Sequence, residues 1–253
     1  MAHLTGSTAL VTGASRGIGR AVAVALAAHG ARVAVGYHRN RAAAEETLRH
    51  LQGTGHCMLP SDCGQPEQDR ALVEEAIRRL GRLDVVVNNA GIFEHHPVAT
   101  SEYDDWLRIW DSTLRANLLG PANISFWAAR HMIGLGGGRI INISSRGAFR
   151  GEPDAPAYGA SKAGMNSMGQ SMAKSLAPHN IYVFTVAPGW VTTDMAEPYL
   201  DGPAGDEVRA QSPLGRLATP EEIAETVLFL ARDAPPTMTG CIIDVNGASY
   251  LRT

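Results

Sequence analysis

Tyr158 and Lys162 are the side chains in this sequence whose types and spacing point first to proton chemistry. Residues four apart on a helix lie about 5–6 Å apart at Cβ, on one face, so we expect the Lys162 ammonium beside the Tyr158 phenol. A free tyrosine has a pKa of about 10, and a nearby positive charge favours the phenolate and lowers that pKa. We therefore predict that Lys162 lowers the pKa of Tyr158 and that the phenol acts as a general acid or base. Such pairs also occur on solvated helix faces, so the other motifs must show whether this pair is catalytic.

A glycine-rich turn lies near the start of the chain. The apolar run 9–11 is followed by Gly13, Gly17 and Gly19 in the pattern G-x-x-x-G-x-G, and then by apolar residues at helical spacing. This order predicts a strand, a turn and a helix. Glycines let the backbone approach a pyrophosphate, whose charge is met by amide groups and by the helix N-terminus. We predict a dinucleotide site here; an ordinary strand-to-helix turn is the alternative.

The end of the second expected strand, residues 33–35, indicates which dinucleotide is bound. A site for NAD usually places Asp or Glu on the ribose 2′-hydroxyl, about 20 residues after the glycines. Tyr37, His38 and Arg39 stand there instead, and Arg16 adds a cation from the glycine turn. Guanidinium groups bind phosphate through charge-assisted hydrogen bonds, so the pattern favours NADP(H), with NAD(H) possible. In the alternative interpretation these are solvated surface side chains.

Three further apolar runs, 57–59, 83–87 and 140–143, are each followed by polar or small residues. Open α/β sheets bind ligands at the carboxyl ends of their strands, so these residues are expected to gather at one site. They are Asp62, Asn88, Asn89, Ala90, Gly91, Ser144 and Ser145.

Composition narrows the function classes. The chain has 253 residues and a net charge of -3, with no basic stripe, so a nucleic-acid partner is not expected. No leader sequence and no membrane-length apolar run is present, so we expect a cytoplasmic protein without a membrane partner. The three cysteines show no metal spacing. His95 and His96 lack a third metal ligand, so we expect solvated loop histidines and no metal site.

Together these motifs resemble the short-chain dehydrogenase/reductase family over essentially the whole chain, and in particular its 3-oxoacyl-(acyl-carrier-protein) reductases. The resemblance is carried by Thr12, Gly13, Gly17, Gly19, Asn88, Asn89, Ala90, Gly91, Asn117, Ser145, Tyr158, Lys162, Pro188 and Gly189. It implies a single doubly wound Rossmann domain over residues 1–253. In that fold a seven-stranded parallel sheet of order 3-2-1-4-5-6-7 carries helices on both faces.

The resemblance also implies the site residues. The catalytic tetrad would be Asn117, Ser145, Tyr158 and Lys162, with Ser144 as the alternative to Ser145. The expected cofactor contacts are Gly13, Ser15, Arg16, Gly17, Ile18, Gly19, Tyr37, His38, Arg39, Asp62, Cys63, Asn89, Ala90, Gly91, Tyr158, Lys162, Pro188, Gly189, Val191 and Thr193. The expected substrate pocket comprises Glu94, Ser145, Phe149, Trp190 and Tyr199. Residues 194–213, mixed in composition, are expected to form a lid.

The predicted activity is the NADPH-dependent reduction of a carbonyl, such as a 3-oxoacyl thioester of fatty acid biosynthesis, to a secondary alcohol. Trp190 and Phe149 favour an apolar or planar substrate, which leaves steroids, quinones and sugar lactones open. The alternatives are an NAD(P)-dependent alcohol, steroid or sugar dehydrogenase and, outside the enzymes, a nucleotide-sensing scaffold. The resemblance further implies a homotetramer or homodimer.

Overall fold

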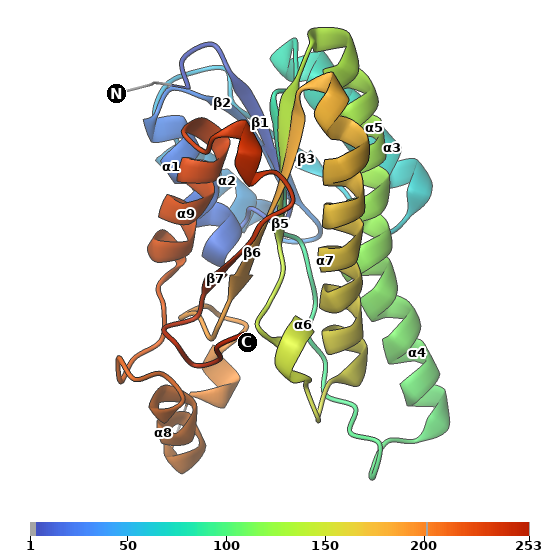
Figure 1. Cartoon of the computed structure of the whole chain (residues 1–253), viewed down its shortest axis with the longest axis vertical. Helices are drawn as coiled ribbons and strands as arrows, with labels where there is room; N and C mark the ends of the chain where they lie inside the picture. The colour runs from blue at the N-terminus through green and yellow to red at the C-terminus, as the bar shows by residue number, and fades with distance from the viewer. Residues whose placement is uncertain (1–3, 201, 253) are drawn as a thin grey trace.

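The computed structural model describes residues 4–200 and 202–252, and a parallel sheet lies between two layers of helices (Figure 1). Its seven strands follow the order β3-β2-β1-β4-β5-β6-β7, and every neighbouring pair is parallel. The strands are β1 (Thr8–Val11), β2 (Arg32–Tyr37), β3 (Cys57–Pro60), β4 (Val85–Asn88), β5 (Gly138–Ile143), β6 (Ile181–Pro188) and β7 (Ile242–Val245). The expected fold class and strand order are therefore confirmed.

The helices divide between the two faces of the sheet (Figure 1). One face carries α1 (Gly17–Ala28), α2 (Arg41–His50) and α9 (Pro220–Arg232). The other carries α3 (Pro66–Leu80), α4 (Tyr103–Leu114), α5 (Gly120–Leu135) and α7 (Pro156–Leu176). The shorter segments are α6 (Gly147–Arg150), α8 (Gly202–Ala210) and the 3-10 turns η2 (Ala177–His179), η3 (Glu197–Tyr199) and η4 (Pro236–Met238). None of the described helices is both long and apolar enough to cross a bilayer.

The central strands are apolar at successive positions because each strand faces two cores. In β4, Val85 and Val87 pack into the core beneath α1 and α9, whereas Val86 packs into the core beneath α3 and α5. Side chains alternate between the faces of a strand, and a sheet covered on both faces buries them all. The faces are therefore closed to ligands, and the carboxyl ends of the strands stay open.

A π turn, η1 (Arg115–Leu119), joins α4 to α5 in one continuous helical run. Asn117 lies in this turn and is fully buried. Single π turns inside helices are frequent at functional sites, because the added residue shifts the backbone groups and side chains around it. The turn places Asn117 toward the Gly91-Ile92 segment that follows β4.

The segment 194–213 is more regular than its composition indicates, since it contains η3 and α8. In Figure 1, α8 lies at the carboxyl-terminal side of the sheet, near the end of the chain. The helix that follows begins as the sequence indicates. The Thr219 hydroxyl accepts from the Glu222 amide at 3.3 Å, and the Glu222 carboxylate accepts from the Thr219 amide at 2.8 Å, which is a capping box.

Substituting Gly19 should show how tightly the glycine turn is packed. A Cβ there would lie 2.4 Å from the Gly13 carbonyl oxygen and 2.5 Å from Asn89 Nδ2, so Gly19→Ala should destabilise the chain by about 1–3 kcal/mol through overpacking. Gly134 is the control, because a Cβ there meets nothing within 4 Å. Gly134→Ala should be neutral or stabilise by up to about 1 kcal/mol. Thermal unfolding measures both, and equal effects would contradict the packing argument.

Candidate active site

A cavity of about 510 Å³ lies at the carboxyl ends of the central strands. Among the predicted residues, those that line it are Gly13, Ser15, Arg16, Gly17, Ile18, Tyr37, His38, Arg39, Asp62, Cys63, Asn89, Ala90, Gly91, Ser145, Tyr158, Lys162, Pro188, Gly189, Trp190, Val191 and Thr193. Those outside its lining are Gly19, Glu94, Asn117, Phe149 and Tyr199. We call this space the main cavity.

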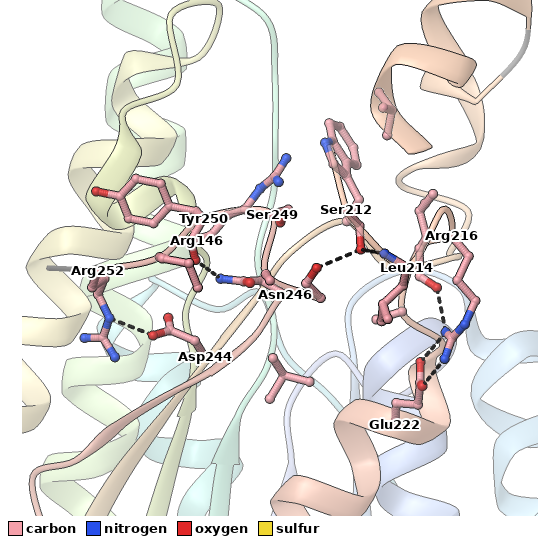
Figure 2. A pocket seen from close by; sticks show the side chains of 18 residues that line it. Arg146, Ser212, Leu214, Arg216, Glu222, Asp244, Asn246, Ser249, Tyr250 and Arg252 are labelled. Carbon is pink, nitrogen blue, oxygen red and sulfur yellow. Dashed lines mark hydrogen bonds and ion pairs between the residues drawn. The ribbon is translucent and has the colours of Figure 1, made fainter. Parts of the chain in front are cut away.

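A second cavity, of about 490 Å³, lies beside the main cavity, and we call it the side cavity. Residues of the C-terminal segment 244–252 and of the segment that precedes α9 line it (Figure 2). Arg146 and Trp190 line both spaces. These two residues therefore stand at the border between the cavities.

The glycine turn is fastened to the end of β4 by Thr12 and Asn89. The Thr12 hydroxyl accepts from the amides of Asn89 at 3.0 Å and Ala90 at 2.9 Å. Asn89 Nδ2 donates to the carbonyls of Thr12 at 2.9 Å and Gly13 at 3.1 Å. The side-chain amide of Asn89 therefore holds the turn in place, a role that its position at a strand end did not reveal. Thr12 was predicted only as part of the motif.

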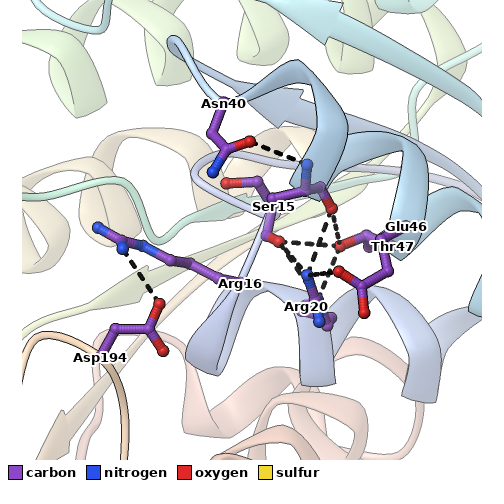
Figure 3. Close-up of polar contacts among 8 residues, drawn as sticks. Ser15, Arg16, Arg20, Asn40, Glu46, Thr47 and Asp194 are labelled. Carbon is purple, nitrogen blue, oxygen red and sulfur yellow. Dashed lines mark hydrogen bonds and ion pairs between the residues drawn. The ribbon is translucent and has the colours of Figure 1, made fainter. Parts of the chain in front are cut away.

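The turn is braced on its other side by Arg20, which was not predicted (Figure 3). Its guanidinium donates to the Ser15 carbonyl at 2.7 Å and to the Thr47 hydroxyl of α2 at 3.0 Å. Beside it, the N-terminus of α1 has no side-chain cap and no acidic residue in its first turn. Such an uncapped N-terminus favours an anion. The donor set of the turn therefore fits the pyrophosphate of a dinucleotide.

The residues predicted to distinguish NADP from NAD lie around one end of the main cavity. Arg39 is exposed there. Arg16 Nη1 lies 3.1 Å from Asp194 Oδ2 (Figure 3), and both side chains are more than half exposed. His38 Nε2 lies 3.6 Å from Asp62 Oδ1. Surface ion pairs of this kind contribute about 0–1 kcal/mol, so they hold neither Arg16 nor Asp62 strongly against a ligand.

Tyr158 lines the main cavity and its ring meets Phe93 edge-on, with centroids 4.9 Å apart. Burial raises the pKa of Tyr158 to about 12, while the hydrogen bond with the Ser145 side chain acts in the opposite direction. The expected lowering of the Tyr158 pKa by Lys162 is therefore wrong. Desolvation disfavours the charged phenolate more than its neighbours stabilise it.

Lys162 is almost fully buried, and its Nζ donates to the Ile143 carbonyl at 2.8 Å. Burial lowers the pKa of this amine to about 8. Nζ lies 5.7 Å from the centre of the Tyr158 ring. The two side chains thus meet at one site as the helical spacing predicts, although burial favours the uncharged form of both.

The structure distinguishes the two candidate serines. The Ser145 side chain acts on the Tyr158 phenol, whose pKa it lowers, and its Oγ accepts from the Gly147 amide at 3.0 Å. Ser144 is buried, and its Oγ donates to the Lys162 carbonyl at 3.3 Å. The side chain of Ser145 therefore faces the phenol, while that of Ser144 secures the backbone of α7.

Asn117 lies behind the cavity wall. Its Oδ1 accepts from the Ile92 amide at 2.8 Å, and its Nδ2 donates to the Ile92 carbonyl at 3.0 Å. A Cβ at Gly91 would stand 3.1 Å from Asn117 Oδ1 and 3.5 Å from Lys162 Nζ. Asn117 thus fixes the segment that passes beside Lys162, and glycine at position 91 leaves room for both groups.

Aromatic side chains form a cluster next to the phenol. Tyr199 stacks on His95 with centroids 5.1 Å apart, and it lies 5.9 Å from Phe93 and 5.6 Å from Trp190. Phe93 lines the main cavity and was not predicted, although its place two residues after Gly91 is a usable signal. Two residues that were predicted to line the substrate pocket, Glu94 and Phe149, contact arginine side chains outside the main cavity instead. Glu94 pairs with Arg108 at 2.8 Å, and Phe149 lies 4.5 Å from the Arg252 guanidinium.

His96 is a buried structural residue, which corrects the expectation of a solvated histidine. Its Nδ1 lies 2.8 Å from the Glu94 carbonyl oxygen, and its Nε2 lies 3.1 Å from the Ala157 amide. These partners assign the neutral tautomer with the proton on Nδ1. His96 therefore caps the start of α7, one residue before Tyr158. Among the described residues, no three His, Cys, Asp or Glu side chains are grouped to hold a metal ion.

Comparison with known proteins finds oxidoreductases that are similar to this chain over nearly its whole length. A family model described as enoyl-(acyl carrier protein) reductase matches residues 13–248. The chain is 39% identical to an uncharacterized oxidoreductase of Methylorubrum extorquens, over 98% of this chain and 99% of that protein. It is 36% identical to a 3-oxoacyl-(acyl-carrier-protein) reductase of Staphylococcus aureus, over 96% and 98%. It is 35% identical to an L-rhamnose 1-dehydrogenase (NAD(P)(+)) of a Sphingomonas species, over 99% of both chains.

Solved structures agree with these relatives. A putative short-chain alcohol dehydrogenase of Sinorhizobium meliloti superposes with a TM-score of 0.90 at 35% identity, covering 98% of this chain and 97% of the other. A short chain dehydrogenase of Burkholderia cenocepacia, solved in complex with NADP, superposes with a TM-score of 0.88 at 33% identity, covering 98% and 99%.

Lys162 should make the stability of the chain increase with pH. Its pKa is about 8 in the folded chain against an ordinary 10.5, so between these values the unfolded chain binds more protons and the free energy of unfolding rises with pH. In urea unfolding, the free energy of unfolding of the wild type should rise by on the order of 2 kcal/mol relative to that of Lys162→Met as the pH increases across this window. Lys174→Met, at an exposed position of the same helix, controls for loss of a surface lysine. A constant or falling difference would contradict the burial effect.

Proposed function

The chain belongs to the short-chain dehydrogenase/reductase family of oxidoreductases that act on alcohol and ketone groups, and from this premise we propose that it reduces a carbonyl to a secondary alcohol with NADPH. The observation that carries the proposal is the meeting of Ser145, Tyr158 and Lys162 in the cavity that also contains the glycine turn. A carbonyl bound in this cavity would then lie beside a proton donor, Tyr158, and a hydrogen-bond donor, Ser145, and close to the turn that would bind the dinucleotide.

The chemistry follows from the groups around the phenol. NADPH, when bound, supplies the hydride. Negative charge then develops on the carbonyl oxygen, which the Ser145 hydroxyl stabilises as a positioned donor. Tyr158 donates its proton to that oxygen as a general acid, and its raised pKa keeps the phenol protonated at neutral pH. The Lys162 ammonium, when protonated, stabilises the phenolate that remains. In reverse, the same groups oxidise an alcohol.

Distinct parts of the main cavity would hold the parts of the cofactor. The amides of the glycine turn would bind the pyrophosphate, and Arg16 and Arg39 would bind the 2′-phosphate. Asp62 and the 89–91 turn would contact the adenine half, as the family resemblance implies. Val191 and Thr193 would contact the nicotinamide carboxamide on the same basis. The NADP complex of the Burkholderia relative supports this cofactor type.

A 3-oxoacyl thioester or a similar ketone is the proposed substrate, supported by the 3-oxoacyl-(acyl-carrier-protein) reductase of Staphylococcus aureus. The second candidate is the dehydrogenation of an alcohol or sugar, which the L-rhamnose dehydrogenase favours. Trp190, Tyr199 and Phe93 would form the apolar wall of the pocket in either case. Residues 194–213 are proposed to act as its lid, with Asp194 at the hinge end next to Arg16.

The proposed assembly is a homotetramer or homodimer in the cytoplasm. Apolar side chains exposed on α4 and α5 support an interface there. They are Tyr103, Leu107, Phe126 and Ile133.

Replacing the phenol hydroxyl should remove turnover while leaving cofactor binding intact. Tyr158→Phe keeps the ring and removes the proton donor, so kcat should fall by about 100-fold or more, while the Kd for NADPH measured by fluorescence stays near the wild-type value. Tyr182→Phe on β6, outside the main cavity, is the matched control and should keep kcat. Unchanged turnover in Tyr158→Phe would remove Tyr158 from the mechanism.

Arginine substitutions should separate NADP from NAD. Arg39→Ala and Arg16→Ala should each weaken NADPH binding by about tenfold, the effect of losing a charge-assisted hydrogen bond, with little change for NADH. Arg41→Ala is the control, because Arg41 pairs with Glu45 on its own helix at 2.8 Å. Calorimetric titration with both cofactors gives the ratio of the Kd for NADPH to the Kd for NADH. A chain that prefers NADH, with NADPH affinity indifferent to Arg16 and Arg39, contradicts the cofactor assignment.

A further inference from the structure

Arg146 is a buried arginine at the border of the two cavities. It follows Ser145 in the chain and is 3% exposed. Its backbone amide donates to the Pro188 carbonyl at 2.8 Å, which fixes the residue at the ends of β5 and β6. Figure 2 shows its side chain within the side cavity, among residues of the C-terminal segment. The residue thus connects the catalytic serine to a space that the proposed mechanism does not use.

The hydrogen bonds of Arg146 are incomplete. Its Nη2 donates to the side-chain oxygen Oε1 of Gln211. Its Nη1 is buried and has no hydrogen-bond partner among the described residues. Arg150 Nη1 also reaches Gln211 Oε1, at 3.5 Å. Two guanidinium groups therefore converge on a single neutral oxygen, whereas a carboxylate offers two oxygens and a charge to such groups.

Among the described residues, no carboxylate forms an ion pair with Arg146. In the side cavity, Arg216 pairs with Glu222 at 2.7 Å and Arg252 pairs with Asp244 at 2.7 Å. These pairs use both carboxylates that line that space.

On the other side of Arg146, Glu152 lines the main cavity and pairs with Arg150 at 3.5 Å. Its field also reaches Arg146, but one carboxylate faces two guanidiniums. A positive charge buried without a direct carboxylate partner is costly unless a ligand supplies one. Burial lowers the pKa of Arg146 to about 10, so the group is still charged at neutral pH.

We propose that Arg146 and Arg150 bind a carboxylate of the carbonyl substrate, which takes the place of the Gln211 amide oxygen between them. The inference rests on the proposed reductase function and deepens it, because it names the substrate class as oxo acids. Arg146 follows Ser145 directly and, with Trp190, lines both cavities. One molecule can therefore present its carbonyl to Ser145 and Tyr158 and its carboxylate to the arginines.

Matched substrates test the proposal with the full chain and NADPH. Acetoacetate and levulinate are each compared with their methyl esters, which keep the carbonyl and lose the charge. Wild type should prefer each acid over its ester in kcat/KM. Arg146→Met should reduce kcat/KM for the acids about tenfold more than for the esters, the loss expected for a charge-assisted contact, and Arg146→Lys should restore part of that preference. Arg49→Met, at an exposed position of α2, should keep the wild-type ratio.

A binding measurement separates this proposal from the reductase function. Calorimetric titration with levulinate should show binding to wild type, weaker binding to Arg150→Met and tighter binding to Gln211→Ala, which vacates the shared oxygen position. These two variants decide the question if Arg146→Met does not fold. Reduction of esters and acids without preference overturns the carboxylate site and leaves the reductase function standing. Levulinate binding that is indifferent to Arg150 and Gln211 also overturns it, whether or not any carbonyl is reduced.

Discussion

The close contact between the ends of β1 and β4 is the constraint on which the site depends. Thr12 and Asn89 tie the two strand ends together through reciprocal hydrogen bonds. Gly13 and Gly19 permit this approach, because a Cβ at either position would meet neighbouring atoms at less than 3.0 Å. The sheet is covered on both faces, so a ligand can enter only where the strands end. The fastened turn therefore determines where the main cavity forms.

Burial then sets the chemistry of the groups that line that cavity. Tyr158 and Lys162 both shift toward their uncharged forms, because each ion loses hydration that its neighbours do not replace. A helical spacing places the two side chains together without making the phenol acidic. Ser145 opposes the shift of the phenol by hydrogen bonding. In the proposed mechanism, the Ser145 hydroxyl and the protonated Lys162 amine supply the polarity needed for proton transfer.

The half-buried Arg139 and the buried Arg146 differ in the groups that accept their hydrogen bonds. Arg139 donates to the backbone carbonyls of Leu230 and Ala234, so it joins β5 to the end of α9. Arg146 instead shares one side-chain amide oxygen and keeps one nitrogen without a partner. Carbonyl groups of a folded backbone cannot leave, whereas a side-chain amide can be replaced. The bonds of Arg139 therefore stabilise the fold, whereas the bond between Arg146 and Gln211 can be exchanged for one to a ligand.

The sequence by itself determined that strands alternate with helices, because both depend on local periodicity, and the resemblance to a known family supplied the strand order. It also placed the glycine turn and the Ser144-Ser145 pair at strand ends, which gather at one edge of a parallel sheet, and it paired Tyr158 with Lys162 by helical spacing. The choice of Ser145 over Ser144 came from the family resemblance. Only the tertiary structure decided the direction of the pKa shifts, the burial of His96 and the lack of a direct carboxylate partner for Arg146 among the described residues. These properties depend on desolvation and on contacts between segments far apart in the chain, such as Arg146 with Gln211. The spacing of residues along the sequence predicts neither the desolvation of a side chain nor its contacts with distant segments.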